Sequence, residues 1–144
     1  MPEFARIVES PLDRDEVEAL LLGDEMGAVV SFVGRVRNHD PEAQGEVVAL
    51  EYSAHPDAEA VLAELLREFT QARREGSNPV RVAAVHRIGR LAVGDAALIV
   101  SVAAAHRTDT FELCRDLVEE IKARVPIWKK QLTADGAGAW VGIA

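Results

Sequence analysis

The chain has 144 residues, of which 49% are apolar and 28% are charged, as in an ordinary single globular domain. Its net charge of −8 argues against non-specific binding to nucleic acid, which requires Lys and Arg to neutralise phosphates. The longest apolar runs are too short to cross a bilayer, the single cysteine excludes an internal disulfide framework, and the N-terminus does not resemble a secretory signal. We therefore expect a cytoplasmic protein.

The first part of the chain is predicted to alternate strands with a helix. Runs of β-branched and aromatic residues indicate strands, and acidic residues in a first turn indicate the start of a helix. In chain order we expect a strand at 4–10, a helix at 12–22 that ends at Gly23, a buried strand at 27–37, a mobile polar loop at 38–46 and a strand at 47–54.

The second part adds two longer helices and further strands. We expect a helix from Pro56 to about Glu75 with Gly76 as its stop, strands at 79–89 and 96–105 joined by a turn at 92–95, a helix that Asp109 and Glu112 open and Pro126 ends, and a terminal hairpin from 127–133 and 139–143. The predicted buried stripes are Val61, Leu62, Leu65, Leu66, Phe69 and Ala72 on the first helix, and Phe111, Cys114, Leu117, Val118, Ile121 and Val125 on the second. This mixture predicts an α+β domain that spans residues 1–144.

All three lysines of the chain, Lys122, Lys129 and Lys130, lie within nine residues, whereas arginine is used everywhere else. Lys122 falls at the edge of the apolar stripe of its helix, where a lysine with a buried stem and a solvated tip is one interpretation. The alternative is a partly desolvated amine that acts as a nucleophile or as an acid and base, which arginine cannot do. Lys129 and Lys130 should face opposite sides of a strand, so only one of them can share a face with a site.

Other basic residues form islands that suit a small anionic ligand. His106 and Arg107 lie where a strand gives way to a helix, and Arg35 and Arg37 are expected on one face of a strand end, with His39 in the following loop. Each of these groups could also be ordinary surface. For His55 we expect capping or packing, and for His86 and Arg87 a structural role at a sheet edge. The sequence has no metal-binding motif, no Gly-rich nucleotide loop and no nucleophile elbow, and Cys114 is expected to pack in the core.

Five segments taken together resemble the large, catalytic subunit of molybdopterin synthase. They are "FVGRVRNH", "LEYSAHPDAEA", "VHRIGRLAVGD", "SVAAAHRTDTFELC" and "IKARVPIWKKQ", in order from about residue 27 to Gln131. The resemblance implies an α/β hammerhead fold with an additional small antiparallel β subdomain, and a central homodimer within a heterotetramer. It also implies a small ubiquitin-like partner whose C-terminal Gly-Gly carries a thiocarboxylate. The implied reaction transfers sulfur onto cyclic pyranopterin monophosphate to form the dithiolene of molybdopterin, without a cofactor.

The resemblance also assigns residues. Lys122 matches the family's essential lysine and Lys129 its second active-site lysine, whereas Arg37, His106 and Arg107 match residues that hold the substrate. Lys130, Arg35 and His39 are candidate contacts of the partner. The chain departs from the family at Gln131, where Glu is common, so no carboxylate role is assigned there.

A further departure is that the chain stops at Ala144, so we expect no C-terminal contribution to a neighbouring site. One rival interpretation is a non-catalytic module that binds a phosphorylated metabolite. Another is a single-strand nucleic-acid platform, which the net charge disfavours.

Overall fold

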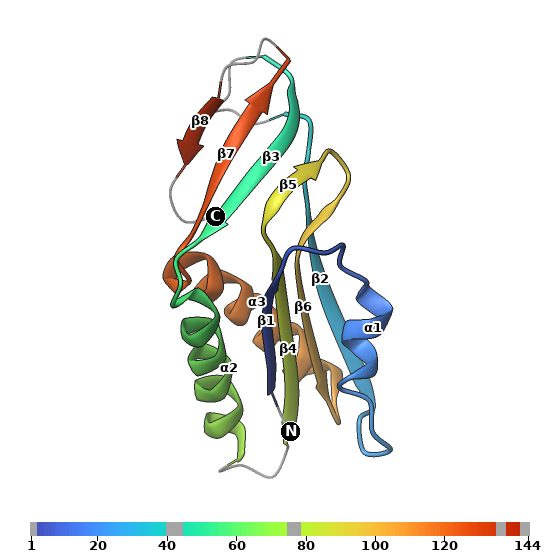
Figure 1. The fold of residues 1–144 in the computed structure, drawn as a ribbon. Coiled ribbons are helices and arrows are strands. Elements are labelled where there is room, and N and C mark those ends of the chain that lie inside the picture. Colours follow the sequence, from blue (N-terminus) through green and yellow to red (C-terminus); the bar gives the residue numbers. More distant parts are fainter. Residues whose placement is uncertain (1–2, 40–44, 75–78, 135–137, 142–144) are drawn as a thin grey trace.

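The structure is a computed structural model that describes residues 3–39, 45–74, 79–134 and 138–141. Two four-stranded sheets account for all the strands in these ranges (Figure 1). The first sheet has the order β1 (Glu3–Val8), β4 (Val80–Arg87), β6 (Ala96–Ala104), β2 (Ala28–Arg35). The second has the order β5 (Gly89–Ala92), β3 (Val47–Ala54), β7 (Ile127–Thr133), β8 (Gly138–Val141). Only β1 and β4 run parallel, so the second sheet is antiparallel throughout.

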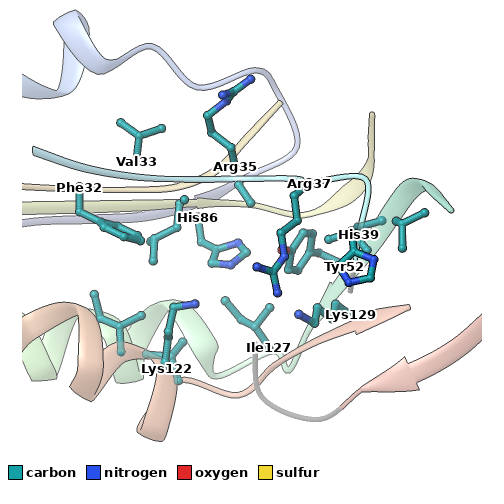
Figure 2. Close-up of a pocket in the computed structure, with 17 residues that line it drawn as sticks. Phe32, Val33, Arg35, Arg37, His39, Tyr52, His86, Lys122, Ile127 and Lys129 are labelled. Atoms are coloured by element: carbon teal, nitrogen blue, oxygen red, sulfur yellow. The ribbon is translucent and has the colours of Figure 1, made fainter. Parts of the chain in front are cut away.

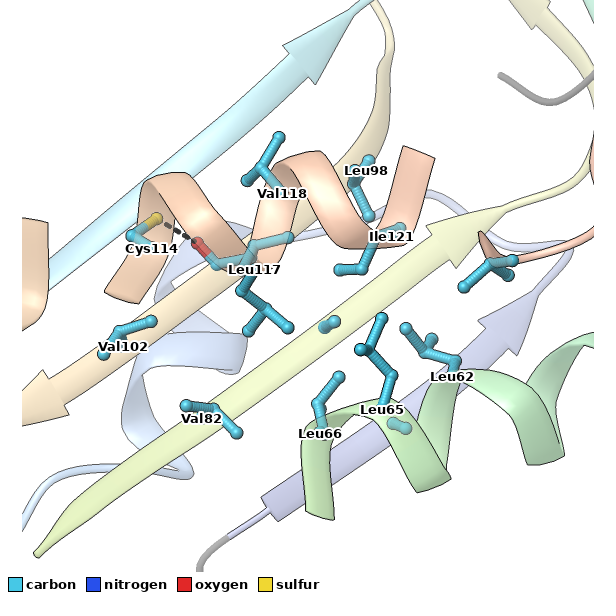
Figure 3. Packing of buried hydrophobic residues seen from close by; sticks show 14 of the residues in the cluster. Leu62, Leu65, Leu66, Val82, Leu98, Val102, Cys114, Leu117, Val118 and Ile121 are labelled. Atoms are coloured by element: carbon cyan, nitrogen blue, oxygen red, sulfur yellow. Dashed lines mark hydrogen bonds between the residues drawn. The ribbon is translucent and has the colours of Figure 1, made fainter. Parts of the chain in front are cut away.

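Helices cover both faces of the first sheet. On one face, α2 (Ala58–Arg74) and α3 (Arg107–Arg124) pack against alternate residues of β4 and β6, and on the other face lies the short helix α1 (Arg14–Ala19) (Figure 1). Leu65 and Leu66 of α2 and Leu117 of α3 are fully buried in the larger core cluster (Figure 3). Arg124 donates two hydrogen bonds to Glu68, at 2.9 and 3.1 Å, and thereby links α3 to α2 at the surface.

The chain passes from the first sheet to the second at Gly89. This residue has a φ of 93°, which an L side chain rarely adopts, and it is the first residue of the four-residue strand β5. The α+β class and the small antiparallel sheet are confirmed, and β3 and β7 have the predicted bounds. We did not predict β5, which lies between the strand expected at 79–89 and the turn expected at 92–95.

Several local predictions were wrong. The strand β2 is an edge strand, not a buried one, and Val29 on it is 37% exposed. Helix α3 begins at Arg107 with His106 as its N-cap residue, so Asp109 lies inside the first turn and does not open the helix. Phe111 is 61% exposed, because Leu113 takes its place in the buried stripe.

The helix α2 also differs from its prediction in detail, since it begins at Ala58, not Pro56, and Ala72 is exposed. Residues 40–44 of the predicted mobile loop, and Glu75 and Gly76 at the predicted end of this helix, lie outside the described ranges. Among the helices that the structure describes, none has the length and apolar character needed to span a membrane.

Candidate active site

A cavity of about 450 Å³ lies where the two sheets and the end of α3 meet. Its walls come from the end of β2 and the residues after it, from β3, the end of β4, the start of β6, the last turn of α3 and the start of β7. Phe32, Leu50, Leu98, Ile121 and Ile127 form apolar parts of this wall. The cavity therefore combines a hydrophobic floor with polar groups from segments far apart in the sequence, as ligand sites commonly do.

Lys122 and Lys129 both line this cavity, although one belongs to a helix and the other to a strand. The helix α3 ends at Arg124 because Pro126 cannot continue it, and β7 then leads the chain back past the cavity. Figure 2 shows the amines of the two lysines directed toward the same space as the guanidinium of Arg37. Lys130 is not among the residues that line the cavity, as expected if only one of the two adjacent lysines shares a face with the site.

Lys122 has an exposed side chain in the single chain, and Lys129 is half-buried. Of the two interpretations of Lys122, the solvated tip fits this chain alone, and the partly desolvated amine would require a further component. The site is open to solvent at this point, and a bound partner or substrate would have to exclude water from the amine.

Arg35 and Arg37 do not share one face, contrary to the prediction. The pairing of β2 with β6 shifts register between Gly34 and Arg35, which breaks the alternation of side chains at the strand end. The Arg35 side chain points away from the two lysines (Figure 2), and its Nε donates a hydrogen bond to the carbonyl of Gly94 at 3.2 Å. Arg35, Arg37 and His39 all line the cavity, but of the two arginines only Arg37 directs its guanidinium toward the lysines (Figure 2). Arg37 is therefore the arginine placed to bind an anion beside them.

Tyr52 and His86 also line the cavity, and our reasoning from the sequence assigned neither to the site. His86 is only 4% exposed and lies on β4, an interior strand, so the predicted role at a sheet edge is wrong. Burial raises the pKa of Tyr52, whereas burial lowers the pKa of His86 to about 4, with a further lowering from the charge of Lys122. The alternation of β4 could have revealed His86, because Val82 and Ala84 on the same face pack in the core beneath α2 and α3.

His106 and Arg107 are not brought to this cavity within one chain. Both are exposed at the N-terminus of α3, whereas Lys122 lies in its last turn. Fifteen residues of helix separate Arg107 from Lys122, which corresponds to roughly 22 Å along the axis. A single chain therefore holds Arg37, Lys122 and Lys129 in one site and leaves His106 and Arg107 apart from them.

The remaining predicted features have structural roles. The ring Nδ1 of His55 accepts a hydrogen bond from the backbone N–H of Asp57 at 3.0 Å, just before α2, as expected for a capping residue. Cys114 is buried with its thiol near the carbonyl of Val100, and burial raises the pKa of the thiol, as expected for a packing residue. Within the described residues, no group of three or more His, Cys, Asp or Glu side chains could hold a metal ion.

The fold and the cavity together define an α+β protein whose site is built for an anionic ligand and for amine chemistry. Lys and Arg side chains offer positive charge and hydrogen-bond donors, and no carboxylate side chain is among the described residues that line the cavity. Residues 7–124 match the family model described as MoaE protein. The chain belongs to the MoaE family.

Individual relatives agree with this assignment. The chain is 39% identical to molybdopterin synthase catalytic subunit 1 of Mycobacterium tuberculosis, over 96% of this chain and 90% of the relative. It is 38% identical to the molybdopterin synthase catalytic subunit of Thermoplasma volcanium, over 95% of this chain and 96% of the relative.

Solved structures share the fold as well. The crystal structure of molybdopterin synthase from Staphylococcus aureus matches with a TM-score of 0.83 and 33% identity, over 96% of both chains. A complex of subunits 1 and 2 of molybdopterin-converting factor from Helicobacter pylori matches with a TM-score of 0.67 and 21% identity, over 98% of this chain and 90% of that chain, which shows the common fold.

Proposed function

We propose that this chain is the catalytic subunit of a molybdopterin synthase. It would transfer sulfur from the thiocarboxylated C-terminus of a small ubiquitin-like subunit onto cyclic pyranopterin monophosphate, and so form the dithiolene of molybdopterin. We place this activity in the cytoplasm and in residues 1–144 acting as one domain. A binding module without activity is not favoured, because the relatives are named as catalytic subunits.

The observation that carries the proposal is the convergence of Lys122 and Lys129 on one cavity in a chain of the MoaE family. Sulfur transfer from a thiocarboxylate creates negative charge on a carbonyl oxygen and requires proton transfers to and from the substrate. Two amines and one guanidinium at the same cavity can supply both the charge stabilisation and the protons.

The two lysines would have different roles. Lys122 would act beside the thiocarboxylate carbonyl as an acid and base or as a transient nucleophile. Lys129 would stabilise the negative charge that develops on the reacting groups, and Arg37 would orient the phosphate of the pterin. These roles match the positions of the three side chains, since all three face the same space (Figure 2).

The small subunit would complete the site by excluding water from it. The cavity is open at Lys122, and an extended C-terminal tail ending in two glycines is narrow enough to enter such an opening beside apolar walls. Insertion of the tail would desolvate the amine of Lys122 and strengthen its interaction with the carbonyl. Lys130, Arg35 and His39 are the candidate contacts for the body of that partner. The Arg35 side chain points away from the lysine pair (Figure 2), and Lys130 is not among the residues that line the cavity.

A second copy of this chain would supply His106 and Arg107 to the substrate. One chain cannot bring these two residues to Lys122, because they lie at the opposite end of α3. In a twofold homodimer whose axis is perpendicular to α3, the two copies of this helix run in opposite directions, so the start of α3 in one protomer can approach the cavity of the other. The full assembly would then be a heterotetramer with one small subunit bound to each protomer.

Reconstitution tests the proposed function. The purified chain is mixed with a thiocarboxylated small subunit and cyclic pyranopterin monophosphate, and molybdopterin is measured. We expect product with the wild-type chain and a loss of it with Lys122→Ala, while the variant still binds the small subunit. Near-normal turnover by Lys122→Ala would refute the role of this lysine, and binding of the pterin without product from the wild-type chain would favour the non-catalytic module.

A further inference from the structure

His86 lies in the wall of the same cavity and has no part in the mechanism described above. It occupies the penultimate position of β4, is 4% exposed, and faces the cavity together with Lys122 and Lys129. Figure 2 draws its ring between the side chains of Arg37 and Lys122. A buried imidazole in such a place contributes either packing or a specific polar contact, and its hydrogen bonds decide between these two roles.

One hydrogen bond fixes the tautomer of His86. Its Nδ1 lies 2.8 Å from the backbone carbonyl oxygen of Arg87. A carbonyl oxygen can only accept, so Nδ1 must carry the proton and donate it. In the neutral ring the other nitrogen, Nε2, then has a free lone pair and can only accept a hydrogen bond.

The ring is also held in place and kept neutral. The ring of Tyr52 packs against it nearly edge-on, with the centroids 4.9 Å apart and an angle of 70° between the planes. Burial and the nearby charge of Lys122 lower the pKa of His86 to about 4, although the bond to Arg87 acts in the opposite direction. At neutral pH the imidazole is therefore uncharged, and its Nε2 is an acceptor of fixed orientation.

This acceptor differs in kind from the cations of the cavity. Arg37, Lys122 and Lys129 can only donate hydrogen bonds, and they suit the phosphate and the carbonyl oxygens of the reactants. A ligand that carried acceptors alone would satisfy these cations but would form no hydrogen bond with Nε2 of His86. A ligand with a hydroxyl or N–H donor at the right place would gain that hydrogen bond in addition.

We propose that His86 is a further substrate-binding residue, whose Nε2 accepts a hydrogen bond from an O–H or N–H group of the pterin and so orients it toward Lys122. The inference rests on the proposed function, since it concerns the substrate of that same site. It identifies the ligand class as a heterocycle that bears hydrogen-bond donors in addition to its phosphate. A bare phosphate ester would use the cations and gain nothing from His86.

Two substitutions distinguish the contribution of Nδ1 from that of Nε2. In His86→Asn the amide nitrogen can occupy the place of Nδ1 and donate to the Arg87 carbonyl, but the side chain is too short to reach the place of Nε2. In His86→Gln the longer side chain can put its oxygen near the place of Nε2. Binding of cyclic pyranopterin monophosphate is measured by calorimetry on the full chain, and turnover is measured with a saturating small subunit.

We expect His86→Asn to weaken pterin binding about 10- to 100-fold and to raise KM by a similar factor, the usual cost of one lost buried hydrogen bond. His86→Gln should recover most of this loss, and both variants should bind the small subunit as the wild type does. Equal pterin affinity for the wild type and His86→Asn would overturn the inference and leave the proposed function intact. Absence of molybdopterin from the wild-type reaction would instead overturn the proposed function.

A measurement on the wild-type protein does not depend on how well the variants fold. In protein labelled with ¹⁵N-histidine, the signal of an imidazole nitrogen that begins to accept a hydrogen bond changes its chemical shift. We expect the Nε2 signal of His86 to move on addition of the pterin and to stay in place on addition of inorganic phosphate. An Nε2 signal that the pterin does not change, or a free protein with the proton on Nε2, would overturn the inference.

Discussion

The edge-on contact between Tyr52 and His86 joins the two sheets at the wall of the cavity. Tyr52 belongs to β3 of the second sheet and His86 to β4 of the first, and their ring centroids are 4.9 Å apart. Pairs of this kind contribute about 0.5–1.5 kcal/mol beyond the area that they bury. The contact therefore fixes the relative position of the segments that carry the polar groups of the site.

Burial of a neutral His86 makes the stability of the fold depend on pH. Its pKa of about 4 in the folded chain lies below the ordinary histidine value of 6.5, so the unfolded chain takes up the proton first as the pH falls. The stabilisation is fully present above pH 6.5 and is lost as the pH falls to about 4, and the gap between the two pKa values corresponds to about 3 kcal/mol. Urea denaturation near neutral pH and in mild acid measures this loss.

Carboxylates also titrate in mild acid and change the stability of the wild type. The contribution of His86 is therefore the difference in pH dependence between the wild type and His86→Gln, which have the same carboxylates. Between about pH 7 and about pH 4.5 we expect the variant to lose about 2–3 kcal/mol less stability than the wild type. If the free energy of unfolding changed equally with pH in the two proteins, His86 would not be buried in its neutral form.

The core beneath α3 provides a second prediction, with its control on the same helix. Leu117 is fully buried, so Leu117→Ala should lower the free energy of unfolding by about 2–5 kcal/mol through lost burial and the cavity left behind. Phe111 is 61% exposed, so Phe111→Ala should change it by less than about 0.5 kcal/mol. Chemical denaturation checks both values. A large loss for Phe111→Ala would mean that another surface covers this ring.

Much of the fold could be predicted from local patterns, and the exceptions have physical reasons. The β-branched and aromatic residues of β3 and β7 indicate strands, and Pro126 defines the end of α3. The short strand β5 has no such pattern, because its pairing with β3 follows from the turn at Gly89 and not from its own residues. The burial of a strand depends on its neighbours in the sheet, so the edge position of β2 was not visible in the sequence.

The site, like the fold, could be predicted only where a local pattern in the sequence indicates it. The three lysines stand out in a chain that otherwise uses arginine, and the family resemblance singles out Lys122 and Lys129 among them. His86 was assigned elsewhere, because its position depends on the interior place of β4. The separation of His106 and Arg107 from the lysines follows from the length of α3, and their use in a site depends on an assembly that no local pattern encodes.

Lys129 and Lys130 form a matched pair for kinetics, since they are adjacent residues of one type on opposite faces of β7. Lys129 lines the cavity, so Lys129→Ala should lower kcat about 10²- to 10³-fold, the usual effect of losing one group that stabilises developing charge. Lys130 lies outside the cavity, so Lys130→Ala should raise the KM for the small subunit and leave kcat at saturation nearly unchanged. Steady-state assays with both reactants varied give these constants. The same fall in kcat for both variants would contradict the division between them.

The homodimer predicts that two inactive variants restore activity to each other. If His106 and Arg107 act on the cavity of the other protomer, a mixed dimer of Lys122→Ala and Arg107→Ala has one site with both defects and one site with neither. Random exchange makes about half of the dimers mixed, so the mixture should recover about a quarter of the wild-type activity. Each variant alone should have little activity, and the mixture is assayed after mild dissociation and reassociation. If Arg107 served the cavity of its own chain, or none, every site in the mixed dimer would keep the defect of one parent. The activity of the mixture would then equal the mean of the two variants, which contradicts a shared site.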